Sequence, residues 1–230
     1  MIYVGIDDTD TLETRGTNQL ARQLARHVAG RLRCRMIVRH QLLEDPRVPC
    51  TCKNGSASLV FDGEPNADVG WLIDELRGVM EAEFVPGSDP GLCVATRVPR
   101  AIVEYGLRCK TVLIEQDEPR ALAREHGLHL EGLGGTEGGV IGALAAIGLV
   151  MTGDDGRIVQ LGGWDDDLTG ICGVASIRAR DVEVRELATS VPVETGSVDV
   201  GKRLRPNLRR GGPVLFVSPC GTDWEAVRLK

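Results

Sequence analysis

The chain has 230 residues, of which 42% are hydrophobic and 26% charged, and its formal net charge is −6. This length suits one large domain or two small ones with a buried core. The acidic balance excludes a generally basic surface, so a nucleic acid would have to meet a local basic patch. Aromatic residues make up only 3% of the chain, which argues against a broad platform for stacking bases.

Targeting and redox signals are weak. The sequence shows no signal-like start and no apolar run near the ~20 residues of a membrane span, so we expect a cytoplasmic protein without membrane contact. Seven scattered cysteines, an odd number, favour reduced thiols over a disulfide framework. Cys50 and Cys52 have the right type for two zinc ligands, but no second pair completes a zinc site.

In chain order, residues 1–98 alternate between strand and helix patterns. They predict strands over 2–7, 34–43, 56–62 and 92–98, and helices over 16–31 and 67–83. The resulting order, β-α-β-β-α-β, is typical of a ferredoxin-like sandwich.

Residues 99–230 predict a mixed α/β half. It starts with a helix near Pro99, continues through a helix over 117–126, and reaches the glycine-rich stretch EGLGGTEGGVIGALAAIG, with a helix starting near Gly139. Strands follow at 157–161, 171–179 and 213–217. The predicted class is therefore α+β, with halves at 1–98 and 99–230. The alternative is that the two halves interleave into one catalytic unit.

Three aspartates, Asp7, Asp8 and Asp10, crowd the end of the first predicted strand. Carboxylates this close repel one another, so the cluster needs a counter-charge, most simply a divalent cation. Mg²⁺ suits one or two carboxylates together with phosphate oxygens. The alternative is an acidic turn that starts at Asp8 and serves only the following helix.

Thr17 lies at the start of the first predicted helix. A threonine there is usually a helix cap. A helix N-terminus also attracts phosphate, and a hydroxyl at that point is placed either to bind a phosphate or to accept one. Both interpretations stay open from the residues alone.

The glycine-rich loop at 132–142 is the second candidate phosphate site. Glycines let backbone N–H groups approach a phosphate, and the following helix would aim its dipole at it. The alternative is that the glycines allow close packing of a small-residue helix. Lys53 and Asn54, in a turn before a strand, could also reach a phosphate.

Two charged runs complete the candidates. Residues 165–167 are all aspartate and favour an exposed loop over a metal site. The stretch GKRLRPNLRR suits a phosphate or RNA backbone, although basic loops are often only solvated. Its cationic residues are Lys202, Arg203, Arg205, Arg209 and Arg210.

Five stretches together resemble the archaeal tRNA-Ile agmatinylcytidine synthetase family, also called agmatidine synthetase. They are VGIDDTD at 4–10, GTNQLA at 16–21, VPCTCKNGSA at 48–57, GGVIGALAAIG at 138–148 and GGPVLFVSPCG at 211–221.

The resemblance implies an enzyme that uses ATP to activate a cytidine carbonyl of the tRNA anticodon for attack by agmatine. It also implies a kinase-like module, a ferredoxin-like module and a threonine that becomes phosphorylated. On the matching positions, Asp7, Asp8 and Asp10 look like ligands of Mg²⁺ and ATP, and Thr17 like the phosphate acceptor.

The sequence departs from the family at three points. The family's OB-fold and zinc ribbon find no match here. Where the family has an arginine before its glycine helix, this chain has the stretch 135–139, Gly-Thr-Glu-Gly-Gly, and where it has a Thr-Thr pair, this chain has Thr17-Asn18. The departures favour nucleotide handling over tRNA modification.

We therefore expect a Mg²⁺-dependent, ATP-using enzyme of ligase or kinase-like class. Its acceptor is a tRNA cytidine carbonyl or a small molecule, so its expected partners are a nucleotide and either a small-molecule amine or tRNA. The alternative is a non-catalytic nucleotide-sensing or RNA-binding module, and the oligomeric state is left open. The expected nucleotide-binding residues are Lys53, Asn54, Gly134, Gly135, Thr136, Gly138 and Gly139.

Overall fold

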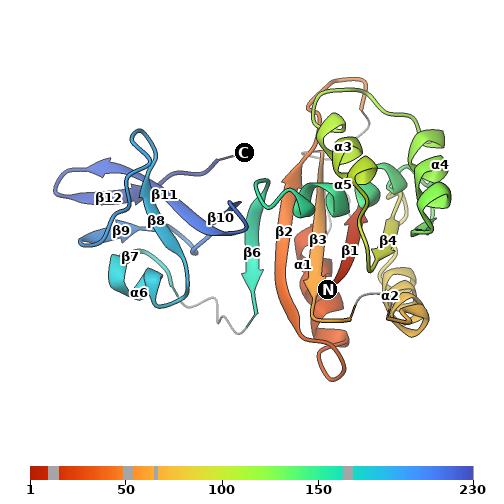
Figure 1. Ribbon diagram of the computed structural model, residues 1–230, viewed down its shortest axis with the longest axis horizontal. Coiled ribbons are helices and arrows are strands. Elements are labelled where there is room, and N and C mark those ends of the chain that lie inside the picture. Colours follow the sequence, from red (N-terminus) through yellow and green to blue (C-terminus); the bar gives the residue numbers. More distant parts are fainter. Residues whose placement is uncertain (10–15, 49–53, 65–66, 163–167, 230) are drawn as a thin grey trace.

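The computed structural model describes residues 1–9, 16–48, 54–64, 67–162 and 168–229. Within these ranges the strands join into one continuous sheet that runs through two lobes (Figure 1). The helices are α1 (Thr17–His27), α2 (Gly70–Ala82), α3 (Arg100–Arg108), α4 (Asp117–His126), α5 (Val140–Met151) and α6 (Val174–Arg178). None of these described helices is long and apolar enough to cross a membrane.

The strands of both lobes belong to the same sheet. They are β1 (Ile2–Asp7), β2 (Cys34–Gln41), β3 (Gly55–Phe61), β4 (Gly91–Ala95), β5 (His129–Gly132), β6 (Arg157–Leu161), β7 (Ile171–Gly173), β8 (Glu183–Glu186), β9 (Ser197–Asp199), β10 (Asn207–Arg209), β11 (Gly212–Cys220) and β12 (Asp223–Ala226). Their order across the sheet is β5-β4-β1-β3-β2-β6-β10-β11-β12-β9-β7, and β8 pairs separately with β11.

The predicted mixture of helices and strands is confirmed. The order β1-α1-β2-β3-α2-β4 is the one expected for residues 1–98. These four strands lie side by side as β4-β1-β3-β2, and every neighbouring pair is antiparallel. The ferredoxin-like arrangement as such and the boundary near residue 98 stay predictions.

Two predicted elements need correction. The strand expected over 171–179 is only three residues long, and the chain then turns into α6. Val174 and Ile177, three residues apart, are both buried, which is the spacing of one helix face rather than of a strand. The helix expected over 16–31 ends at His27, where the chain enters a turn through Val28.

The first lobe has three layers, because the alternating side chains of β1 face two different cores. Val4 and Ile6 pack with α1 and α2. Tyr3 lies on the opposite face, toward the core formed by α3 and α5. Helix α5 is buried almost all round, as expected of a helix that is apolar on every side.

Gly5 lets α5 come unusually close to the sheet. A Cβ atom at Gly5 would lie 1.9 Å from the backbone oxygen of Ala143, so only a glycine fits at this point of β1. Helix α5 packs across β1, β3 and β4 (Figure 1). Its N-terminus is thereby held at the end of β1, where the aspartates are.

The second lobe is small and mostly β. Helix α6 and strands β7, β8, β9, β11 and β12 enclose a separate valine- and leucine-rich core. Strands β6 and β10 link it to the first lobe, since β6 pairs with both β2 and β10, and β10 pairs with β11 (Figure 1).

A buried polar chain joins β2, β3 and the turn before β6. The His40 ring has no exposed surface; its Nδ1 is 2.9 Å from Asp155 Oδ1, and its Nε2 is 2.9 Å from Ser58 Oγ. Lys110 forms an ion pair with the same carboxylate. Although Ser, His and Asp are in line, Ser58 is also fully buried, so the trio is structural and not a hydrolytic site.

The buried hydrogen bonds of His40 predict that the stability of the protein depends on pH. Burial lowers the pKa of His40 below its usual 6.5, and the hydrogen bond with Asp155 opposes this shift only in part. Because the unfolded state binds the proton more readily, the free energy of unfolding should fall as pH drops below about 6.5, by up to about 1.4 kcal/mol per pH unit.

Urea unfolding between pH 7.5 and 5.5 measures this slope. His40→Gln should be less stable throughout but should lose this part of the pH dependence. His126→Gln, at the end of α4, is the control and should keep the wild-type slope. Equal slopes in wild type and His40→Gln would contradict the prediction.

Candidate functional site

Asp7 is the last residue of β1, and Asp8 follows it directly. Asp8 has a φ of 47°, a left-handed conformation that aspartate tolerates better than most residues. Its carbonyl accepts a hydrogen bond of 3.1 Å from the Asp89 amide. The turn predicted to start at Asp8 continues into residues outside the described ranges and stays a prediction. Asp10 lies outside the described residues.

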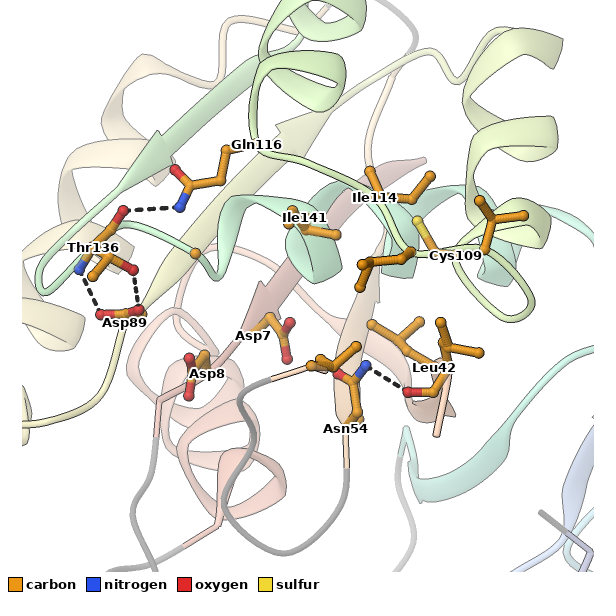
Figure 2. A pocket seen from close by; sticks show the side chains of 16 residues that line it. Asp7, Asp8, Leu42, Asn54, Asp89, Cys109, Ile114, Gln116, Thr136 and Ile141 are labelled. Atoms are coloured by element: carbon orange, nitrogen blue, oxygen red, sulfur yellow. Dashed lines mark hydrogen bonds between the residues drawn. The ribbon is translucent and has the colours of Figure 1, made fainter. Parts of the chain in front are cut away.

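The two aspartates line a pocket of about 190 Å³ at the N-terminus of α5 (Figure 2). Asp8, Asp89 and Thr136 form its polar end, and Asp7 and Ile141 lie between the two ends. The apolar end is formed by the β2–β3 connection and the segment after α3. Its lining residues are Leu42, Leu43, Val48, Cys109, Val112, Leu113 and Ile114.

Asp7 is pressed against the first turn of α5. The residue is only 9% exposed, and a Cβ atom at Gly142 would lie 1.8 Å from Asp7 Oδ2. The helix has no acidic residue of its own in that turn and no side-chain cap. The carboxylate of Asp7 therefore supplies the negative charge that a helix N-terminus favours.

Asp89 belongs to the site although the sequence reasoning missed it. Its Oδ1 accepts a 2.6 Å hydrogen bond from the Thr136 amide, and its Oδ2 accepts one from the Thr136 hydroxyl. Asp89 enters the site because β4 pairs with β1, which places Gly91 opposite Asp7. In the sequence it reads only as the turn SDPG, which carries no signal of a site.

The glycine loop is held by its own protein contacts. Thr136 and Gly138 line the pocket, and Gln116 Nε2 donates a 3.0 Å hydrogen bond to the Thr136 carbonyl. The amides of Thr136, Glu137, Gly139, Val140 and Ile141 already donate to acceptors within the chain. In this arrangement these amides do not point at a phosphate, and Gly134 and Gly135 are not among the lining residues.

Three further sequence candidates have different positions. Asn54 lines the pocket, but its side-chain amide donates to the Leu43 carbonyl at 2.9 Å and so shapes the β2–β3 connection. Lys53 lies outside the described residues. Thr17 is buried as the first residue of α1, whose N-cap is Gly16, and it does not line this pocket. The interpretation of Thr17 as the cap is therefore wrong, and its role as phosphate acceptor stays a prediction.

The remaining charged and cysteine motifs predicted from the sequence do not line this pocket where the structure describes them. Cys50, Cys52 and residues 165–167 are outside the described ranges. The basic run divides in two. Arg209 donates to the Asp154 carbonyl and the Arg210 amide to its carboxylate. The other part of the run, Lys202, Arg203 and Arg205, lines a second cavity away from this pocket.

Cys109 is the only cysteine among the described lining residues of the pocket, and its thiol is unreactive. Burial raises the pKa of its thiol to about 12, and hydrogen bonding with Tyr105 opposes this only in part. The thiol is protonated at neutral pH, which excludes a nucleophilic thiolate. The pocket therefore offers carboxylate chemistry.

The carboxylates suit a cation that a ligand helps to bind. Within the described ranges, no three acidic, histidine or cysteine side chains form a metal cage by themselves. Asp7 and Asp8 do open into one pocket, and carboxylate oxygens are what Mg²⁺ prefers. Because Mg²⁺ is usually held by one or two carboxylates together with phosphates and water, these residues fit such an ion.

Comparison with solved structures identifies a shared fold. A structure of TiaS with tRNA(Ile2) and ATP matches with a TM-score of 0.57 and 24% identity over 64% of this chain and 36% of that one. A tRNA fluorescent labeling enzyme matches with a TM-score of 0.56 and 24% identity over 64% and 35%. TiaS with tRNA(Ile2), AMPCPP and agmatine gives 0.54 and 23% over 64% and 35%.

These likenesses show that most of the chain has the fold of part of TiaS, which is also described as tRNA(Ile2) agmatidine synthetase. The chain spans little more than a third of the length of these proteins. No protein-family model matches it. No curated protein matches it either.

Asp89→Ala should loosen the glycine loop. The change removes both hydrogen bonds to Thr136, so we expect the free energy of unfolding to fall by about 1–3 kcal/mol. Hydrogen exchange at the Thr136 amide should become faster. Asp74→Ala, at an exposed position of α2, is the control and should change stability by less than about 0.5 kcal/mol. Unchanged protection of Thr136 would show that Asp89 does not hold the loop.

Proposed function

We propose that this protein is a Mg²⁺-dependent enzyme that uses ATP to activate an acceptor, in the manner of agmatidine synthetase. The observation that carries the proposal is the pair Asp7 and Asp8, at and just after the end of β1, which line a pocket at the N-terminus of α5. The fold that the chain shares with TiaS supports it, since TiaS has been described in complexes with ATP and with AMPCPP and agmatine.

The two ends of the pocket suit the two ends of a nucleotide. Leu42, Ile114 and Ile141 give an apolar wall for a base, and the carboxylates lie toward the phosphates. A volume of about 190 Å³ is below the ~300–1,000 Å³ of a typical ligand pocket, so it accommodates only part of ATP. The rest of the nucleotide then extends from the acidic end.

The carboxylates make a cation necessary. A triphosphate beside Asp7 and Asp8 would be repelled, and a bound Mg²⁺ would offset this repulsion. In the proposal these two residues hold the ion together with Asp10. When bound, Mg²⁺ neutralises charge that develops on the transferring phosphoryl or nucleotidyl group. Asp7 is fixed at the end of β1 against α5, so in the proposal it determines where the ion is held.

The acceptor is a cytidine carbonyl of tRNA or a small molecule. Once phosphate or nucleotide is attached to the acceptor oxygen, an amine displaces it, which places the enzyme among ligases. Relatives in fold are described with tRNA(Ile2) and agmatine, and this chain matches only about a third of them. The choice of tRNA as substrate therefore belongs to the proposal.

A second candidate function is a nucleotide-sensing module without turnover. It is favoured by the glycine loop, where the amides of Thr136, Glu137 and Gly139 already donate hydrogen bonds within the protein and do not cradle a phosphate. ATP consumption separates the two functions. An enzyme releases phosphate or pyrophosphate when an acceptor is supplied, whereas a sensor binds ATP and leaves it intact.

ATP affinity should depend on Mg²⁺ through Asp8. Asp8→Asn keeps the shape and removes one charge, so it should weaken Mg²⁺-dependent binding by a few kcal/mol, on the order of a hydrogen bond to a charged group. Isothermal titration with Mg²⁺ or with EDTA measures the effect. Asp74→Asn, on exposed α2, is the matched control. Equal ATP affinity in all three proteins, with and without Mg²⁺, would reject the metal site.

Thr17 should gain a phosphate if it is the acceptor. Intact mass after incubation with Mg²⁺ and ATP should rise by one phosphate in wild type and in Thr17→Ser, which keeps a hydroxyl. Thr17→Ala should show no gain while remaining folded. Thr111→Ala, at an exposed position, is the control and should be modified normally. A gain that persists in Thr17→Ala would place the acceptor elsewhere.

A further inference from the structure

A second cavity, which we call the basic groove, lies between the two lobes. Helix α1 and strand β6 form one side, and the other side is formed by Lys202, Arg203, Arg205 and Arg228. Its volume is about 1240 Å³, and it shares no lining residue with the pocket at α5. Consecutive residues at the end of β1 divide the cavities, since Asp8 lines the pocket and Thr9 the groove.

The groove is cationic in an otherwise acidic chain. Among its described lining residues Glu83 is the one acidic side chain. The chain as a whole carries a net charge of −6, so this concentration of positive charge is local. The cationic lining residues are Arg22, Arg26, Arg157, Lys202, Arg203, Arg205 and Arg228.

Arg157 shows that these charges crowd one another. It is half-buried on β6, and its Nε has no hydrogen-bond partner among the described residues. Burial lowers the pKa of its guanidinium, and the neighbouring Arg39, Arg228 and Arg205 lower it further. Like charges held together in partial burial repel one another, and an anionic ligand reduces this repulsion.

A buried hydroxyl adds a second kind of contact. Thr9 is 6% exposed and lines the groove, and its Oγ1 has no hydrogen-bond partner among the described residues. A buried hydroxyl without a hydrogen bond is unfavourable, so a ligand acceptor there would stabilise it. Two arginines are already oriented by backbone carbonyls: Arg22 donates to that of Val159, and Arg205 to that of Leu204.

We propose that the basic groove binds an extended chain of phosphate groups. Phosphate oxygens are acceptors with negative charge, which is what guanidinium, ammonium and hydroxyl groups together recognise. The volume is far larger than one phosphate needs, and the cations come from α1, β6, the 202–205 segment and the C-terminal region, so the ligand spans several of them. The same chemistry occurs in a nucleic-acid strand and in polyphosphate.

Binding of a labelled single-stranded RNA oligonucleotide, with tripolyphosphate as competitor, tests this proposal. Lys202→Gln/Arg228→Gln removes two exposed charges of the groove and should weaken RNA binding at least tenfold. The slope of log affinity against log salt should also become shallower, by about 0.7 for each phosphate that the variant no longer neutralises. Arg100→Gln/Arg124→Gln changes net charge equally at exposed sites on α3 and α4 and should bind as wild type.

The outcomes separate the two phosphate sources. RNA binding that the groove variant loses and the control keeps identifies a nucleic-acid strand. Tripolyphosphate binding with the same dependence, without RNA binding, identifies polyphosphate. Binding of neither probe, or equal affinity in the two double variants, overturns the proposal. Matched thermal unfolding midpoints exclude misfolding as the cause.

This inference does not depend on the ATP proposal. Asp8→Asn should bind RNA or tripolyphosphate with wild-type affinity, because Asp8 does not line the groove. A protein that binds a phosphate chain but not ATP would reject the proposed enzyme and keep the groove.

Discussion

The close approach of α5 to β1 is the constraint on which the site depends. Gly5 in the strand allows a helix backbone to lie directly against it, and Gly142 allows the Asp7 carboxylate to lie against the first helical turn. Larger residues at either point would push the helix away from the sheet. The pocket exists because this contact holds a helix N-terminus and a strand end together.

That contact also sets the electrostatics of the pocket. The carboxylate of Asp7 lies at the positive end of the α5 dipole, and Asp89 accepts hydrogen bonds from the amide and the hydroxyl of Thr136. The helix end and the loop are therefore partly neutralised by the protein itself. A phosphate at this site gains more from a cation on the carboxylates than from the loop amides, and this is why the metal is central to the proposed function.

The acidic pocket and the basic groove are adjacent, because Asp8 lines the first and Thr9 the second. Acidic side chains gather on the α5 face of β1, whereas arginines gather between α1, β6 and the second lobe. Separation of this kind keeps the proposed Mg²⁺ ligands from being neutralised by neighbouring arginines. It also places a cation-rich surface within one residue of the acidic pocket, since Asp8 and Thr9 are adjacent.

The sequence by itself determined the local elements and the acidic motif. The apolar run Ile2-Tyr3-Val4 predicts β1, the periodicity of 117–126 predicts α4 with its observed bounds, and the strand at 157–161 is likewise observed as predicted. Short segments were less predictable. Residues 171–179 form three strand residues followed by a five-residue helix. Over so few residues the apolar pattern does not distinguish the two-residue repeat of a strand from the 3.6-residue repeat of a helix.

Only the tertiary structure decided which residues meet. Asp89 lies 82 positions after Asp7 and joins it through the pairing of β4 with β1, a register that no local pattern encodes. The basic run 202–210 looks uniform in sequence, yet folding directs Arg209 and Arg210 toward Asp154, whereas Lys202, Arg203 and Arg205 line the same groove as Arg157. Strand pairing and helix packing act between distant segments, so they are properties of the folded chain and not of any stretch of it.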